Sequence, residues 1–187
     1  MRDQLKAIVA DFEAASARLH ALKYGLDEEA WGARHGERTW SAAECVEHLN
    51  RTSAAFLPLI RGKLAEAPRL TAPRRLRRDP LGFFLWSIMP PPVRLMRVKT
   101  SGSFVPVDTE DPDVLCARFD ALQAEQIACV TAAEGLAIDK VMLASPFDPR
   151  AKYNLYACLG ILPRHQHRHL WQAEQAAKTA GAGIAPA

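Results

Sequence analysis

Apolar residues recur at intervals of three and four positions along most of the chain. In residues 4–24 this spacing places Ile8 and Phe12 on one face, which predicts an amphipathic helix. The same spacing predicts three more long helices, over residues 42–64, 111–131 and 155–179. No stretch alternates apolar and polar residues convincingly enough to predict a strand. The sequence therefore predicts an all-α fold, an up-and-down four-helix bundle.

Residues that favour helix starts stand in the expected places. Ser41 precedes the second long helix and Glu44 follows three positions later, which is the capping-box pattern. Asp111 followed by Pro112 predicts the start of the third long helix. Pro163 falls inside the last helix, where it predicts either a kink or the start of a second piece.

The connection between the second and third long helices, residues 67–108, is rich in proline and arginine. Only one short helix, over residues 81–89, is predicted there. The most apolar part, residues 81–96, is interrupted by Gly82 and three successive prolines and is too short to cross a bilayer. We therefore expect no membrane partner.

Length and composition indicate one globular domain. The chain has 187 residues, of which 49% are hydrophobic and 24% are charged. We expect a single domain over residues 1–180 and a disordered tail over residues 181–187. Acidic residues stand where a secretion signal would have its apolar core, so we expect a cytoplasmic location.

Charge gives little reason to expect a nucleic-acid partner. The 24 lysines and arginines exceed the 21 acidic residues by only three. Basic residues are concentrated only in the arginine run at residues 74–78, and a run of that size is more often a solvated surface than a phosphate site. No predicted helix carries a basic face. We therefore expect no nucleic-acid partner.

Three of the six histidines fall in the segment 165–169. On a helix, His165 and His169 project from the same face, whereas His167 points to nearly the opposite side. Two imidazoles one turn apart can hold one divalent ion, although such pairs also occur in histidine-rich segments without a ligand role. His48, on the second long helix beside its apolar stripe, is the third candidate ligand.

Three neutral nitrogens plus solvent form the open coordination of a catalytic metal, and they suit Zn²⁺, Ni²⁺ or Fe²⁺ alike. Glu44 lies one turn before His48 and is a candidate to fix the orientation of that ring. Gln172 lies three residues after His169 and is the corresponding candidate there. The catalytic residues beyond these cannot be assigned from the sequence.

The four cysteines form no close pair and are predicted to be reduced. Cys45 is three residues before His48 and shares much of that helix face. A thiolate from Cys45 or Cys158 would complete the coordination sphere and make the metal site structural rather than catalytic.

Three segments together resemble the DinB/YfiT-like proteins. Residues 40–49 (WSAAECVEHL) resemble the family's Trp-Ser-x-x-Glu-x-x-x-His-Leu signature, whose histidine is a metal ligand. Residues 98–106 resemble the Lys-Thr and Phe-x-Pro segment of one branch, and residues 165–172 resemble the C-terminal His-x-x-x-His-x-x-Gln motif. The matches occur in the family's order. The resemblance implies a four-helix bundle, often a homodimer, with a divalent metal held by His48, His165 and His169.

The reaction that the resemblance implies is less definite. Some relatives transfer a low-molecular-weight thiol such as bacillithiol, mycothiol or glutathione onto a small electrophile, others use a thiol cofactor for isomerisation, and many have no known activity. We expect a metal-dependent enzyme acting on a small molecule, either a thiol S-transferase or a hydrolase. The alternative is a non-catalytic metal-binding or stress-response module with a structural or vestigial site.

Overall fold

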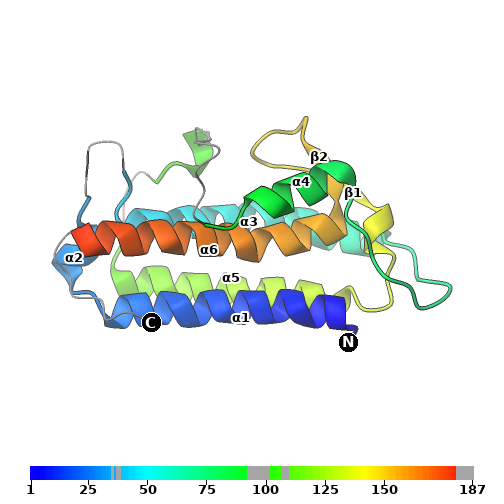
Figure 1. Ribbon diagram of the computed structural model, residues 1–187, viewed down its shortest axis with the longest axis horizontal. Coiled ribbons are helices and arrows are strands. Elements are labelled where there is room, and N and C mark those ends of the chain that lie inside the picture. The colour runs from blue at the N-terminus through cyan, green and yellow to red at the C-terminus, as the bar shows by residue number, and fades with distance from the viewer. Residues whose placement is uncertain (35, 37–38, 92–101, 107–109, 180–187) are drawn as a thin grey trace.

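Four long helices lie side by side along the length of the molecule (Figure 1). They are α1 (Asp3–Tyr24), α3 (Ala42–Glu66), α5 (Pro112–Ala132) and α6 (Leu155–Thr179). The computed structural model describes residues 1–187 except 35, 37–38, 92–101, 107–109 and 180–187. The four-helix bundle predicted from the sequence is confirmed. The predicted tail at 181–187 and the Lys-Thr segment at 98–100 lie outside the described residues.

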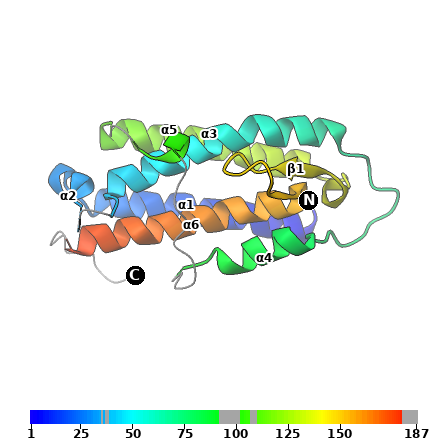
Figure 2. The same cartoon turned by 90° about the horizontal axis from the view of Figure 1, so that it is seen from above.

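The helices form a ring in which α1 and α3 each pack against both α5 and α6. Helices α1 and α3 therefore lie on opposite corners, as do α5 and α6. Figures 1 and 2 show that α1 and α6 run in one direction and α3 and α5 in the other. The directions do not simply alternate along the sequence, because the long connection after α3 returns the chain to the end of the bundle where α3 began.

Shorter elements cover the ends and sides of the bundle. They are α2 (Glu28–Gly32), α4 (Pro80–Ile88), the 3₁₀ turns η1 (Gly102–Phe104) and η2 (Ile138–Lys140), and the strands β1 (Met142–Ala144) and β2 (Lys152–Asn154). The short helix predicted at 81–89 is confirmed. The expectation of no strand is wrong, because β1 and β2 pair in an antiparallel hairpin with Leu143 opposite Tyr153. Strands of three residues are too short for an alternating pattern to be recognised in the sequence.

The predicted helix starts are confirmed. The hydroxyl of Ser41 accepts from the Glu44 amide at 3.2 Å, and the Glu44 carboxylate accepts from the Ser41 amide at 2.9 Å. The Asp111 carboxylate accepts from the Asp113 amide at the start of α5. Helix α6 continues across Pro163, which is itself buried, so that packing on both sides holds the helix together there.

The arginine run beside α4 is partly engaged in packing. Arg74 forms an ion pair with Asp139 at 2.6 Å. The guanidinium groups of Arg78 and Arg164 lie 4.1 Å and 3.5 Å from the ring centre of Trp86, which fastens α4 to α6. Part of the run is therefore an element of the fold.

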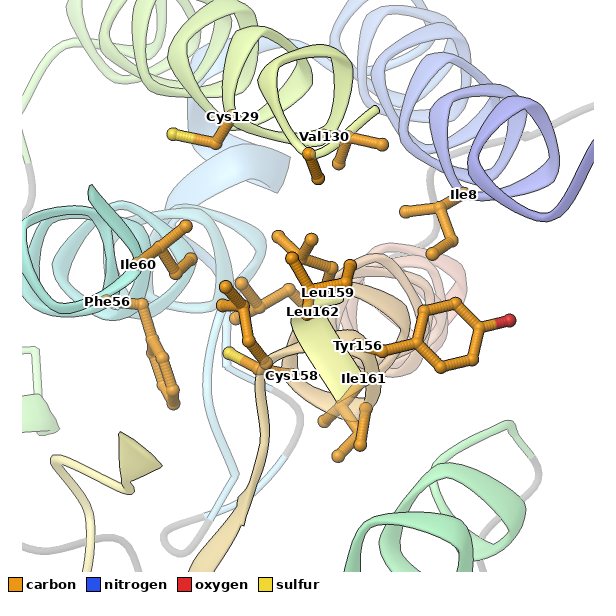
Figure 3. Packing of buried hydrophobic residues seen from close by; sticks show 14 of the residues in the cluster. Ile8, Phe56, Ile60, Cys129, Val130, Tyr156, Cys158, Leu159, Ile161 and Leu162 are labelled. Carbon is orange, nitrogen blue, oxygen red and sulfur yellow. The ribbon is translucent and has the colours of Figure 1, made fainter. Parts of the chain in front are cut away.

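The core consists of two apolar clusters separated along the bundle. Figure 3 shows the first apolar cluster, where Ile8, Ile60 and Val130 from three helices face Leu159 of α6. The second apolar cluster includes Leu19, Trp31, Val46, Leu49, Leu115, Phe119 and Leu170. The change from one cluster to the other falls near the middle of each long helix, between Phe12 and Ala15, Leu49 and Phe56, Phe119 and Cys129, and Leu162 and Leu170.

Polar side chains occupy the level between the two clusters. We call this set the polar layer, and it comprises His48, Gln123, Gln126, His165, Gln166 and His169. The Gln166 amide of α6 donates to Gln123 at 2.8 Å and to Gln126 at 3.1 Å, both on α5. Buried polar groups require such partners, so the layer links α6 to α5 across the middle of the bundle.

No helix in the described part of the chain is long and apolar enough to cross a membrane.

Candidate metal centre

Three histidines from two helices meet in the polar layer. His48 lies in the second turn of α3, and His165 and His169 lie one turn apart in the middle of α6. The packing of α3 against α6 brings them together across 117 positions of sequence. His48 and His169 are buried, with 2% and 9% of their surface exposed, and His165 is partly buried. They are a group of candidate ligands whose donor atoms all lie within 4.8 Å of one another.

The ring nitrogens that converge are the Nε2 atoms. Nε2 of His165 lies 3.4 Å from Nε2 of His48 and 3.1 Å from Nε2 of His169. Metal–nitrogen bonds of about 2.0–2.1 Å in a tetrahedral site separate neighbouring ligand nitrogens by about 3.3–3.4 Å. These two separations are close to that value, and the donor atoms of all three rings lie within 4.8 Å of one another, which is consistent with one shared ion.

The tautomer of His48 is set by the main chain. Its Nδ1 lies 2.8 Å from the carbonyl oxygen of Phe104, in the 3₁₀ turn η1. A carbonyl oxygen can only accept, so Nδ1 carries the proton and donates it. In the neutral ring Nε2 then has a free lone pair directed at the other histidines. This is the form of imidazole that binds a metal.

Hydrogen bonds among the rings account poorly for the same geometry. Because Nε2 of His48 is an acceptor, Nε2 of His165 would have to donate to it. That nitrogen carries at most one proton, so if it donates to His48 it cannot also accept from Nε2 of His169 at 3.1 Å, and if it accepts from His169 it has no proton for His48. A cation placed between three lone pairs satisfies all three nitrogens, which a single proton does not.

Electrostatics keep the three rings neutral. Burial lowers the pKa of His165 and His169 well below the ordinary value, and the neighbouring histidines and Arg168 lower it further. Burial also lowers the pKa of His48, although its hydrogen bond to the Phe104 carbonyl opposes this effect. Neutral imidazole is the ligand form, so the lone pairs are available at neutral pH.

Aromatic side chains enclose the histidines. The Trp40 ring lies 4.9 Å from the His48 ring and 5.9 Å from the His169 ring, measured between centroids. Phe147, in the turn between β1 and β2, lies 5.9 Å from His165 and 4.2 Å from Phe104. These rings give the site apolar walls.

Comparison with known proteins agrees with this geometry. The family model of the DinB superfamily matches residues 11–173. The chain belongs to the DinB superfamily. The solved structure of YfiT from Bacillus subtilis, described as a probable metal-dependent hydrolase with an unusual four-helix bundle topology, has the same fold. Its TM-score is 0.65 at 16% identity, and the match covers 97% of this chain and 90% of YfiT. No curated protein matches the sequence.

Glu44 and Gln172, which were predicted to orient the ligand rings, have different surroundings in this DinB-superfamily chain. The Glu44 carboxylate accepts from the Ser41 amide and from the Arg34 guanidinium, so its described contacts stabilise the start of α3. Gln172 does interact with His169, and this interaction raises the pKa of His169 against the effect of burial. Of these two residues, Gln172 is therefore the one that interacts with a candidate ligand ring.

The cysteines do not join the histidine group. Cys45 packs in the second apolar cluster and Cys158 in the first, and burial raises the pKa of both thiols. The candidate ligand group found among the described residues consists of histidines alone. The geometry gives no support to a structural site completed by a thiolate.

Several residues of the site were not predicted. Phe147 lies in a turn that joins two strands unrecognised in the sequence, so no pattern indicated that it reaches the histidines. The Phe104 carbonyl is a main-chain group, which every residue type has, so the sequence does not indicate its role. The Phe-x-Pro likeness at residues 104–106 was the one signal that pointed to this segment.

Proposed function

We propose that this protein is a divalent-metal-dependent enzyme in which His48, His165 and His169 are the protein ligands. The convergence of their Nε2 atoms, at separations of 3.4 Å and 3.1 Å, is the observation that carries the proposal. The three rings are neutral, which supports Zn²⁺, Ni²⁺ or Fe²⁺ as the ion. Three protein ligands leave a coordination position for solvent or substrate, as catalytic sites require.

When bound, the divalent ion supplies Lewis-acid chemistry, which lowers the pKa of water or a thiol at the remaining position and yields a nucleophile near neutral pH. The nucleophile comes from solution rather than from the chain. Burial raises the pKa of all four cysteine thiols, to about 11 for Cys116 and further for Cys45 and Cys158, so none is available as a thiolate.

The chain's own residues then act on the proton and on the substrate. The Phe104 carbonyl holds the proton of His48 at Nδ1 and so keeps Nε2 free as a ligand. Trp40 and Phe147 provide apolar surfaces for a small substrate. The reaction class that this arrangement suits is attack of an activated nucleophile on a small electrophile.

We favour hydrolysis as the reaction, because YfiT, which has a similar fold, is described as a probable metal-dependent hydrolase. Transfer of a low-molecular-weight thiol, of the bacillithiol, mycothiol or glutathione kind, uses the same site with a different nucleophile. Hydrolysis and thiol transfer are distinguished by whether turnover requires an added thiol. A homodimer and a cytoplasmic location stay predictions.

The test begins with metal content. Wild-type protein purified without a histidine tag, and the His48→Ala, His165→Ala and His169→Ala variants, are analysed for transition metals. We expect about one ion per wild-type chain and its loss in each variant. Metal-free and reloaded wild type are then assayed on small esters and alkyl halides, with and without thiol. A protein that holds its metal firmly and turns over none of these would favour the non-catalytic metal-binding module instead.

A further inference from the structure

The carbonyl that fixes His48 does not belong to the helical bundle. Phe104 ends the 3₁₀ turn η1, which lies in the connection between α3 and α5. Such a connection is free to move unless other contacts hold it. The direction of Nε2 of His48 is therefore only as well defined as the position of this segment.

A second side chain of α3 bonds to the next carbonyl of the same segment. Arg51, three residues after His48, donates from a terminal guanidinium nitrogen to the Val105 carbonyl at 3.4 Å. Its Nε donates to the Glu47 carboxylate at 2.6 Å, which holds the guanidinium in place along the helix. Two successive carbonyls, of Phe104 and Val105, are thus bonded by one face of α3.

Glu47 connects this arrangement to α5. Its side chain is only 8% exposed and lies between two arginines, Arg51 and Arg118, whose nitrogens are 2.6 Å and 3.6 Å from its oxygens. Arg118, from α5, also pairs with Glu110 at 2.7 Å. A buried carboxylate is stable only when cations are paired with it, so the ion pair with Glu47 holds the Arg51 guanidinium in this position.

We propose that Arg51 and Glu47 are positioning residues for the metal site. They hold residues 104–105 against α3, and through the Phe104 carbonyl they fix the tautomer and direction of His48. Arg51 and Glu47 do not touch the ion. Their role as metal-site residues rests on the proposed function, whereas their effect on the His48 ring does not depend on a metal.

The experiment measures both effects separately. In metal-free protein, ¹⁵N chemical shifts of the His48 ring report which nitrogen carries the proton. In the same protein, zinc affinity is measured by competition with a chromophoric chelator. The variants are Arg51→Ala and the milder Glu47→Gln. The control is Arg61→Ala. It removes an exposed ion pair between α3 and α5, in which Arg61 and Glu125 are 2.6 Å apart.

Wild type and Arg61→Ala should show His48 protonated at Nδ1. Arg51→Ala should show a mixture of tautomers, and its zinc affinity should fall by about 10- to 100-fold, as when an outer partner of a metal-bound histidine is lost. Glu47→Gln should shift both quantities in the same direction by less. Arg51→Lys, which keeps the charge beside Glu47 but lacks the planar fork, should restore only part of the effect.

Results that contradict the proposal are equally distinct. If Arg51→Ala keeps the wild-type tautomer while its melting temperature falls, Arg51 serves only the stability of the fold. An unfolded Arg51→Ala leaves the decision to Glu47→Gln, for which an unchanged tautomer and zinc affinity contradicts the proposal. If the tautomer changes as expected but wild type binds no zinc, the positioning role stands and the proposed function fails.

Discussion

His165 and His169 reach the candidate site by a different route from His48. The two histidines of α6 are one turn apart, so the helix itself sets their separation. His48 comes from α3, 117 positions from His165, and its ring depends on a carbonyl 56 positions away. One half of the site is thus specified by local geometry and the other half by tertiary packing. We expect the first half to be robust and the second half to be sensitive to changes outside the bundle.

Removal of a ligand should have the largest effect on either half. His169→Ala and His48→Ala should each weaken zinc binding on the order of a thousandfold, because one of three protein bonds to the ion is lost. Isothermal titration or chelator competition measures the change. His167→Ala is the control, since His167 lies on another face of α6 and bonds to the Asp11 carbonyl at 3.1 Å. An equal loss in His167→Ala would contradict the assignment of the ligand face.

The next largest effect concerns how α6 is held in place. Gln166→Ala removes the amide that bonds to Gln123 and Gln126 and leaves both without that partner in a buried layer. The free energy of unfolding should fall by about 2–4 kcal/mol, measured by urea denaturation of metal-free protein. A double-mutant cycle with Gln123→Ala should show coupling between the two positions. Additive losses would show that the polar layer does not act as a unit.

Metal-free protein should also lose stability as the pH falls. Folding lowers the pKa of His48, His165 and His169, so below about pH 6.5 the unfolded chain binds protons that the folded chain does not. Each such histidine contributes a loss of about 1.4 kcal/mol per pH unit between its unfolded and folded pKa values. Urea denaturation from pH 7 to pH 5 measures the slope. His165→Ala should show a smaller slope, because one of the three histidines is then absent.

The smallest effect compares the two predicted orienting residues. Gln172→Ala should weaken zinc binding a few-fold, because Gln172 interacts with His169. Glu44→Gln should cost on the order of 1 kcal/mol of stability, because it weakens the bond that the side chain accepts from the Ser41 amide and the pairing with Arg34. We expect its zinc affinity to stay near that of wild type. The opposite pattern would mean that Glu44 rather than Gln172 serves the histidines.

The helices and the ligand face of α6 were predictable because their signals are local. Apolar spacing defined α1 and α6, and the Ser41–Glu44 pair defined the start of α3. Pro163 predicted either a kink or the start of a second piece, and the second piece does not occur, since α6 runs unbroken from Leu155 to Thr179 with Pro163 itself buried. Local rules thus succeed except where packing overrides them.

The rest of the site could not be predicted because it depends on contacts far apart in the sequence. Phe147 reaches the histidines from a hairpin with three-residue strands, and the Phe104 carbonyl does so from the connection before α5. In the sequence, Glu47 and Arg51 are four positions apart, a spacing that indicates only an ion pair on a helix surface. Only the fold shows that this pair is half-enclosed and bonded to the segment that holds His48.

The most direct test of the central claim is a crystal of the zinc-loaded protein measured at the zinc absorption edge. We predict one anomalous peak about 2.0–2.1 Å from Nε2 of His48, His165 and His169, with a solvent molecule at the remaining position. A peak bonded to other residues, or a histidine cluster that remains empty in excess zinc, would contradict the account.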